Sequence, residues 1–450
     1  MTVLADAIST VDRTQPMLLS GTVAEVRGLT LWVADLPLPI GAMVEVASGG
    51  ERRAGEVVGF DDEQTIVMLM GSTGGLRRGD RVSGRQFAAE APVGGAMLGR
   101  VVDAMGAAID GRGPIPDRTT RPVMPQPIGA LERAPIRQPL GTGVRALDTM
   151  LTVGRGQRLG VFAGPGVGKS TLLGQIARHT DADVSVIALV GERGREVNDF
   201  LEHALGDNGL QRSVVVVSTG DEPALRRVRA AFYALAVAEH FRDAGRDVVL
   251  FMDSVTRFCQ AQRQIGLAIG EPPATKGYPP SVFAMLPTLF ERAGRLNNGS
   301  ITGFYTILVE GDDMTEPISD AARGTLDGHV VLSRDLAAQA HWPAVDVLDS
   351  VSRLANAVTD HEHQAARDQA LRLLSEYRKV EDLVNIGAYA AGSNPRADLA
   401  IACKDQIDLL LRQRVDEPSD FDKARKQLIA LGQAIAQSAQ QTSKNPGKGN

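Results

Sequence analysis

The first part of the chain alternates short apolar runs with clusters of glycine, proline and polar residues. The runs that suit β-strands cover residues 18–26, 29–34, 42–47, 56–60 and 65–70. Turn-forming sequences such as Ser48-Gly49-Gly50 separate them. Several short strands at this spacing are typical of a small β-barrel. We therefore predict a β-barrel domain over residues 17–87, preceded by an N-terminal tail over residues 1–16.

Longer apolar runs follow a glycine- and proline-rich stretch at residues 92–143. They cover residues 184–190, 214–217, 248–252, 302–309 and 329–332, and helical patterns lie between them. A continuous β-branched run such as Val214-Val215-Val216-Val217 suits a parallel sheet that is covered on both faces. Strands that alternate with helices predict a doubly wound α/β domain. We place this domain at residues 88–355, including its leading segment.

Helical spacing dominates the last part of the chain. Two sets of apolar residues recur near one helix face each: Leu371, Leu374, Tyr377 and Leu383, and then Phe421, Leu428, Leu431 and Ile435. This pattern predicts a C-terminal helical domain over residues 356–438. The final residues are polar and include Pro446 and Gly447. We expect a disordered tail over residues 439–450.

Composition narrows the class of protein. With 43% apolar and 23% charged residues, the 450-residue chain has the make-up of a soluble globular protein. A net charge of −6 argues against a nucleic-acid coat protein. Cys259 and Cys403 lie far apart, which excludes a zinc cluster or disulfide scaffold and fits a reducing cytoplasm. We expect no signal peptide and no membrane span, so that any membrane association is peripheral.

One glycine-rich turn between a strand and a helix carries the strongest chemical signal. Its sequence is Ala163-Gly164-Pro165-Gly166-Val167-Gly168-Lys169-Ser170-Thr171. Such a turn wraps the phosphates of a nucleotide, because glycines let backbone N–H groups converge on phosphate oxygens. We expect residues 164–171, here called the P-loop, to bind nucleotide, with Lys169 on the β- and γ-phosphates and Ser170 on Mg²⁺. Ala163 relaxes the strict pattern, and the alternative is a glycine-rich turn without nucleotide.

Two carboxylates follow predicted strands and complete a candidate hydrolytic site. Asp253 ends the run at residues 248–252, where an acidic residue beside a P-loop can face Mg²⁺. Without the P-loop it would be an ordinary core strand end. Glu192 follows the run at residues 184–190 and could orient the attacking water, while Arg193 could offset phosphate charge. The alternative for Glu192 and Arg193 is a solvated charged face.

Several further segments carry a family resemblance. They lie at residues 191–196, 253–257, 270–283, 309–313, 326–329, 343–346 and 350–353. The string GEPPATKGYPPSVF at residues 270–283 is far more specific than the P-loop. Together these segments resemble the type III export ATPases of bacterial flagella and injectisomes, which are related to the catalytic head of rotary ATP synthases. The resemblance covers the chain from about Gly21 to Leu411 and implies a RecA-like nucleotide-binding domain.

The resemblance also implies roles for single residues. Glu192 matches the carboxylate that polarises the hydrolytic water, and Arg193 matches a cation beside the γ-phosphate. Asp253 matches the acid that holds the Mg²⁺ shell through water, and Arg257 an arginine near the phosphates. Arg353 matches the arginine finger, which acts on the nucleotide of the neighbouring subunit.

Two aromatic residues are candidates for the adenine pocket. Trp342 stands where the related rotary enzymes carry an aromatic residue against adenine, and a flat indole can stack on a purine. The alternative is a buried core tryptophan beside Pro343. Tyr389 is a candidate for a second wall of the pocket.

The resemblance implies an Mg-dependent ATPase, with ATP and Mg²⁺ as cofactors, that energises protein export by unfolding or releasing chaperone-bound substrates. The implied partners are further copies in a hexameric ring, a stator-like regulatory protein, a central stalk protein, export substrates with their chaperones, and the membrane export gate. The ring would lie in the cytoplasm, peripherally at the inner membrane, without nucleic acid. The segment at residues 381–389 favours the flagellar over the injectisome branch.

Two other functions stay open at this point. A hexameric RNA translocase would need aromatic stacking platforms on the barrel, where the aromatic residues are Trp32, Phe60 and Phe87 without a clustered basic pattern. A non-catalytic rotary subunit typically lacks the catalytic carboxylate, which Glu192 supplies here. The basic run at residues 226–229 is expected to be a solvated helix face or a contact between subunits.

Overall fold

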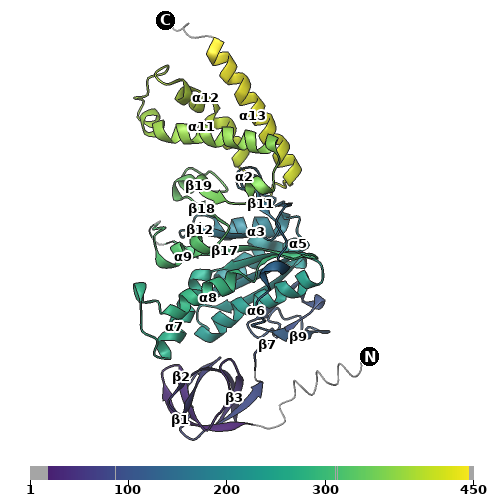
Figure 1. Cartoon of the computed structure of the whole chain (residues 1–450), viewed down its shortest axis with the longest axis vertical. Coiled ribbons are helices and arrows are strands. Elements are labelled where there is room, and N and C mark those ends of the chain that lie inside the picture. Colours follow the sequence, from purple (N-terminus) through teal and green to yellow (C-terminus); the bar gives the residue numbers. More distant parts are fainter. Residues whose placement is uncertain (1–18, 87, 310, 312, 445–450) are drawn as a thin grey trace.

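Three layers follow one another along the long axis of the molecule (Figure 1). A β-barrel lies at one end, an α/β layer in the middle and a group of helices at the other end. The computed structural model describes residues 19–86, 88–309, 311 and 313–444. The predicted N-terminal tail at residues 1–16 lies outside the described residues. The order of the layers confirms the predicted fold class of barrel, doubly wound α/β domain and helical domain.

The N-terminal layer is a closed barrel with the strand order β1-β2-β5-β4-β3-β6. Its strands are β1 (Ser20–Arg27), β2 (Thr30–Ala34), β3 (Met43–Ser48), β4 (Glu51–Asp61), β5 (Gln64–Leu69) and β6 (Arg81–Gln86). Alternate side chains such as Leu31, Val33 and Val67 point inward and are fully buried. The barrel prediction omitted β6, where Val82 alone turns an apolar side chain into the core.

The central layer is built on a nine-stranded sheet with the order β19-β18-β12-β17-β15-β13-β14-β8, in which β16 pairs with β17. The strands are β8 (Arg100–Asp103), β12 (Arg158–Ala163), β13 (Val184–Glu192), β14 (Ser213–Thr219), β15 (Asp247–Asp253), β16 (Gly294–Arg295), β17 (Ser300–Leu308), β18 (Gly328–Leu332) and β19 (Val345–Ser352). The strands from β18 to β8 are parallel, whereas β16 and β19 are antiparallel to their neighbours. Parallel strands place their carboxyl ends at one edge, where a ligand can bind.

Helices cover both faces of this sheet. They are α2 (Arg145–Met150), α3 (Lys169–His179), α4 (Gly194–Asp199), α5 (Gly206–Gln211), α6 (Ala224–Asp243), α7 (Val255–Ala268), α8 (Pro280–Phe290), α9 (Pro317–Thr325) and α10 (Arg334–Ala338). A π-helical turn, η3 (Phe200–Leu205), packs on α3. One hydrophobic core lies under α6, α7 and α8, and a second lies under α2 and α3. Two cores on opposite faces are the mark of a doubly wound domain.

The leading segment of the central domain forms small strands of its own. β7 (Glu90–Val93) pairs with β9 (Thr119–Pro122), and β10 (Pro139–Leu140) pairs with β11 (Val153–Gly154). The segment also contributes β8, which joins the main sheet beside β14. The glycine- and proline-rich stretch is therefore an ordered part of the α/β layer.

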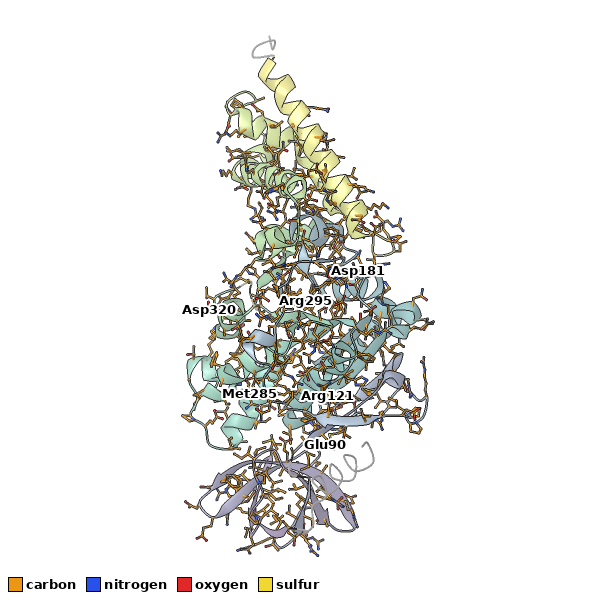
Figure 2. All side chains as sticks on the ribbon, turned by 45° about the vertical axis from the view of Figure 1, so that its right-hand side comes forward. Glu90, Arg121, Asp181, Met285, Arg295 and Asp320 are labelled. Carbon is orange, nitrogen blue, oxygen red and sulfur yellow. The ribbon has the colours of Figure 1, made fainter. Side chains whose placement is uncertain are left out.

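The expectation of a solvated face or subunit contact at residues 226–229 is wrong. Arg227 and Arg229 on α6 are only 7% and 5% exposed. Arg229 donates to the backbone oxygen of Glu90 at 2.9 Å, and Arg227 donates to Gln264 at 2.7 Å. Figure 2 places Glu90 where the barrel meets the central layer. These guanidinium groups are buried because residues far away in sequence supply their acceptors.

Three helices form the C-terminal layer: α11 (His361–Asn385), α12 (Pro395–Leu411) and α13 (Phe421–Lys444). Asp360 and Asn394 cap α11 and α12 by accepting backbone N–H groups. Apolar faces of these helices share the core of α2 and α3. α13 continues to Lys444, past the predicted boundary at residue 438. Within the described part of the chain, no helix has the length and apolar character that a membrane crossing requires.

Candidate active site

The P-loop joins β12 to α3 at the carboxyl edge of the sheet. Gly166 and Gly168 have φ angles of 79° and 84°, in the left-handed region that favours glycine. Gly168 is also the N-cap residue of α3, so the first turn of the helix begins at Lys169 and Ser170. Leu172, Leu173 and Ile176 are buried and hold α3 against the sheet. The local fold therefore aims backbone N–H groups and the positive end of a helix into one cavity.

A cavity of about 440 Å³ opens in front of the P-loop. Its lining residues come from the P-loop and from the ends of neighbouring strands and helices: Gly164, Pro165, Gly166, Gly168, Lys169, Ser170, Thr171, Leu189, Gly191, Glu192, Arg193, Glu196, Val197, Phe200, Asp253, Arg257 and Leu308. Val167 is 3% exposed and supports the loop from the core. Most of the residues that the sequence indicated for the site thus line one cavity.

Lys169 stands between two carboxylates. Its Nζ atom contacts Asp253 Oδ1 and lies 3.6 Å from Glu192 Oε1. Glu192 is the last residue of β13 and Asp253 the last residue of β15, two adjacent parallel strands. Thr306 on β17 donates a hydrogen bond to Asp253 Oδ1 at 2.7 Å. The pairing of β13 with β15 therefore places the two carboxylates side by side, and the start of α3 places Lys169 between them.

Burial changes the ionisation of this cluster. Burial, reinforced by the negative charge of Asp253, raises the pKa of Glu192 to about 7, although Lys169 opposes the shift. Burial alone would lower the pKa of Lys169, but the attraction of Asp253 and Glu192 outweighs it and raises the pKa. The cluster combines a fixed cation with a carboxyl group that exchanges its proton near neutral pH. Such a group suits general base chemistry.

Oxygen donors beside the P-loop fit a magnesium ion. Asp253 offers a carboxylate that is 2% exposed, and Ser170 offers a hydroxyl at the start of α3. Mg²⁺ is usually held by one or two such protein oxygens together with phosphates and water. In the described ranges, no group of three or more His, Cys, Asp or Glu side chains is arranged to hold a metal ion. The donor set fits Mg²⁺ that arrives with a nucleotide.

Two arginines from the sequence prediction also reach the cavity. Arg193 is largely exposed, and its Nη1 atom lies 3.4 Å from Glu196 Oε1. Arg257 lies in the first turn of α7 and packs against Gly191, where an added Cβ would come within 2.7 Å of Arg257 Cβ. Arg257 Nη1 donates to Gln260, whereas its buried Nε bonds to none of the described residues. Both arginines line the cavity in front of the P-loop.

The two candidate adenine residues lie in different places. A Cβ added to Gly168 would come within 2.8 Å of Trp342 Cζ3, so the indole lies directly on the P-loop. Trp342 is 40% exposed and is therefore no buried core residue. Tyr389 lies in the turn between α11 and α12 and donates to Asp398 at 3.0 Å. Neither Trp342 nor Tyr389 is among the described residues that line the cavity, and Tyr389 braces its own turn instead.

Arg353 lies on another surface of the chain. It follows β19, and its backbone N–H donates to Asp327 O at 3.1 Å. Its exposed side chain donates to Arg323 O at 3.3 Å. Arg353 is not among the residues that line the P-loop cavity of its own chain. Apart from this contact with Arg323, the side chain of Arg353 is exposed on the surface of the described chain.

The sequence prediction missed Thr306, which orients the carboxylate of Asp253. The signal was a buried hydroxyl near the end of β17, a strand that also buries the hydroxyl residues Ser300, Thr302 and Tyr305. Buried hydroxyls need a partner, and the neighbouring strand β15 ends in Asp253. Only the pairing of β15 with β17 turns this signal into a site residue.

Three family models cover most of the chain. The model of the ATP synthase alpha/beta family, beta-barrel domain, matches residues 23–84, and that of the nucleotide-binding domain of the same family matches residues 143–352. The model of the T3SS EscN ATPase C-terminal domain matches residues 359–430. The flagellum-specific ATP synthase of Pseudomonas aeruginosa is 48% identical over 423 residues, which are 93% of this chain and 94% of that protein. The chain belongs to the type III export ATPases.

Other relatives of this export ATPase come from both branches of the family. The type 3 secretion system ATPase of Xanthomonas euvesicatoria is 46% identical over 413 residues, with 91% of this chain and 93% of that protein covered. Identities of 48% and 46% do not separate a flagellar from a secretion role. The predicted enzyme class is confirmed: the protein is an ATPase with a nucleotide-binding domain of the ATP synthase alpha/beta family.

Solved structures share the fold of this export ATPase along nearly its whole length. The assembled ATPase EscN from the type III secretion system of enteropathogenic E. coli superimposes with a TM-score of 0.86 at 41% identity. The match covers 92% of this chain and all of that chain. A second structure holds EscN in complex with its central stalk EscO and has a TM-score of 0.85, the same identity and the same coverage.

Proposed function

We propose that this ATPase hydrolyses Mg-ATP to energise protein export, most directly export of flagellar components, by unfolding or releasing chaperone-bound substrates. The observation that carries the hydrolytic part is the cluster of Lys169, Asp253 and Glu192 at the P-loop. The flagellar branch is supported by the resemblance at residues 381–389. Export by an injectisome is the second candidate, supported by relatives of nearly equal identity.

Each group of the site has a separate task in this proposal. Residues 164–171 bind the triphosphate, with Lys169 on the β- and γ-phosphates. Ser170 and Asp253 would hold Mg²⁺, which neutralises charge on the phosphate oxygens. Glu192 accepts a proton from the attacking water, and Arg193 and Arg257 balance phosphate charge. Trp342 stacks on the base above Gly168. Tyr389, which donates a hydrogen bond to Asp398 beside the turn between α11 and α12, remains a proposed second wall of the adenine pocket.

Arg353 is proposed to act on the nucleotide of a neighbouring copy. It lies outside the cavity of its own chain and has an exposed side chain. In a ring with cyclic symmetry, each copy presents this surface to the next one. An arginine supplied in this way stabilises charge in the transition state. This action requires a ring of identical copies, and we propose the homohexamer that the family resemblance implies as the active form.

Further partners belong to the same proposal. The structure of a relative with its central stalk supports a central stalk protein for this chain. A stator-like regulatory protein, export substrates with their chaperones and the membrane export gate complete the set. The ring would act in the cytoplasm, at the periphery of the inner membrane, and without nucleic acid.

Glu192→Gln tests the hydrolytic mechanism. The variant keeps the size of the side chain but loses the base, so phosphate release falls about 100-fold or more while ATP binding is retained. Phosphate release and binding of a fluorescent ATP analogue measure the two properties separately. Glu202→Gln makes the same change at an exposed position and serves as the control. Hydrolysis by Glu192→Gln at the parental rate would overturn the mechanism.

The export role is tested in the cell of origin. A chromosomal Glu192→Gln change should abolish secretion of flagellar rod and hook proteins into the medium, while their synthesis continues. Loss of needle-complex proteins instead would assign the chain to an injectisome. Normal secretion of both sets by a variant without hydrolytic activity would contradict the export role.

A further inference from the structure

Strand β19 contains a large bulge a few residues before Arg353. Asp346 pairs with Val331 and Val351 pairs with His329, so the residues from 347 to 350 lie opposite Val330 alone. Such a bulge leaves backbone groups without ladder partners and redirects the end of the strand. The direction in which Arg353 leaves the sheet therefore depends on the shape of this bulge.

Side chains within the bulge hold its shape. Asp346 Oδ1 accepts hydrogen bonds from the backbone N–H groups of Leu348 at 3.0 Å and Asp349 at 3.1 Å. Ser350 Oγ accepts from the N–H of Val331 at 2.9 Å and donates to Asp346 O. The carboxylate of Asp346 is thus the central acceptor of the bulge.

Arg378 on α11 contacts the bulge from the helical domain. Its Nη2 atom lies 2.7 and 2.6 Å from the two carboxylate oxygens of Asp346, and its Nη1 atom lies 2.9 Å from Asp349 Oδ1. The contact borders a cavity of about 700 Å³ between the sheet edge and α11 and α12. Beside this cavity the planar guanidinium group of Arg378 joins the two layers by pairing with two carboxylates. Such pairing fixes both the distance and the orientation between the arginine and its partners.

The chain between the bulge and Arg353 is firmly held. Ser352 Oγ donates to Thr152 O at 2.8 Å and accepts from Gln157 Nε2 at 3.0 Å. The backbone N–H of Arg353 donates to Asp327 O. A shift of the bulge would therefore be passed to Arg353 through a short and constrained segment.

We propose that Arg378 is a positioning residue that sets the placement of Arg353 through Asp346 and Asp349, and so couples the helical domain to hydrolysis in the neighbouring subunit. This inference rests on the proposed action of Arg353 across the subunit boundary. The helical domain would then also influence the rate of hydrolysis. A partner that tilts α11 would shift the position of Arg353 in one subunit and so change the turnover of ATP in the next subunit.

The effect of Arg378 on stability can be distinguished from its effect on the position of Arg353. The side chain of Arg378 is 45% exposed, and exposed ion pairs contribute little to stability. Asp346 is only 13% exposed, but it keeps the backbone N–H groups of Leu348 and Asp349 as donors, so Arg378→Ala should lower the thermal unfolding temperature only slightly. Because a small displacement of a catalytic group has a large effect on rate, kcat should fall about ten-fold or more with little change in KM for ATP. Arg378→Lys, which keeps the charge but not the planar guanidinium group, should recover part of the loss.

Lys379→Ala is the matched control on the same helix. Lys379 pairs with Glu376 inside α11 and makes no hydrogen bond to the bulge in the described part of the chain. This variant should keep the parental kcat. Equal kcat values for Arg378→Ala and Lys379→Ala would overturn the proposal.

Mixed rings give the decisive test. Lys169→Ala removes the P-loop cation but leaves the finger intact, whereas Arg378→Ala would do the reverse. In rings assembled from equal amounts of both, about a quarter of neighbouring pairs combine an intact P-loop with an intact finger. Activity should then rise to about a quarter of the wild-type rate, roughly five-fold above the mean of the two variants alone. Arg378→Ala mixed with Arg353→Ala should show no such gain.

A reference mixture distinguishes the possible failures. If Arg353→Ala with Lys169→Ala gains activity but Arg378→Ala with Lys169→Ala does not, Arg378 has no positioning role and the action of Arg353 across the boundary stands. If neither mixture gains activity, Arg353 does not act across the subunit boundary, and the proposed role of Arg378 is wrong as well.

Discussion

Asp148 on α2 links the stability of the protein to pH through one buried carboxyl group. Burial raises its pKa to about 7, although the N–H and hydroxyl of Thr142 donate to Oδ1 at 2.9 and 2.7 Å and favour the charged form. Its Oδ2 atom is buried without a partner among the described residues. The folded chain therefore holds the proton more tightly than the unfolded chain, whose aspartate has a pKa near 4. This contribution to stability is complete below about pH 4 and is lost as the pH rises to about 7.

Asp148→Asn removes this titration and is expected to change the pH dependence of unfolding. The free energy of unfolding of the wild type, relative to the variant, should fall between about pH 4 and pH 7. Urea unfolding of both proteins at several pH values measures the difference. Any loss of the Thr142 hydrogen bonds gives an offset that does not depend on pH. A difference that stays flat over this range would show that Asp148 is ionised in the folded chain.

At the scale of elements, the fit of α3 against η3 fixes the position of the P-loop. A Cβ added to Gly174 in α3 would lie 2.4 Å from the backbone oxygen of Ala204. No real side chain approaches a backbone atom so closely, so one of the two helices must move. Because Lys169 and Ser170 begin α3, such a movement displaces the groups that hold phosphate.

Gly174→Ala is therefore expected to lower the free energy of unfolding by about 1–3 kcal/mol and to weaken ATP binding. Gly324→Ala in α9 is the matched control, since an added Cβ there meets no atom within 4 Å. The control should be neutral or slightly stabilising, because alanine favours helices. Chemical unfolding and nucleotide titration of both variants provide the comparison. Equal stability of the two variants would contradict the close packing of α3.

The elements differ in how far the sequence could predict them. Buried strands such as β14 are apolar on both faces and are visible in the sequence without tertiary information. β6 was missed because Val82 is its single inward apolar residue, and Arg229 was misplaced because its acceptor is a backbone oxygen of Glu90. The P-loop and the strand-end acids were predictable from local sequence, whereas the role of Thr306 depends on strand pairing.

At the scale of the whole molecule, Arg145 joins the central layer to the helical domain. It lies on α2, where its backbone N–H donates to Gln413 Oε1 at 2.8 Å and its Nε donates to Leu410 O at 3.0 Å. Its guanidinium group also pairs with Glu417. These acceptors lie in the segment between α12 and α13 or just before it. One buried side chain thus organises the connection between two helices of another layer.

Arg145→Ala is expected to loosen this connection and expose the segment at residues 412–420 to proteases. Limited proteolysis with mass spectrometry should show cleavage there about ten-fold faster than in the wild type, because the open form becomes more populated. Arg414→Ala removes an exposed arginine from the same segment and should leave the cleavage rate unchanged. Equal protection of the Arg145→Ala variant would mean that the apolar core alone holds the helical domain.

The closed barrel has a consequence for crowded assemblies. A sheet edge offers unpaired backbone groups that can recruit strands from other molecules, and closure of β1 against β6 removes such edges from this layer. Copies of the chain can then accumulate at high local concentration without strand-to-strand aggregation through their barrels. Contact between neighbouring barrels has to be made by side chains, including the charged residues on the outer surface, and is therefore adjustable by ionic strength.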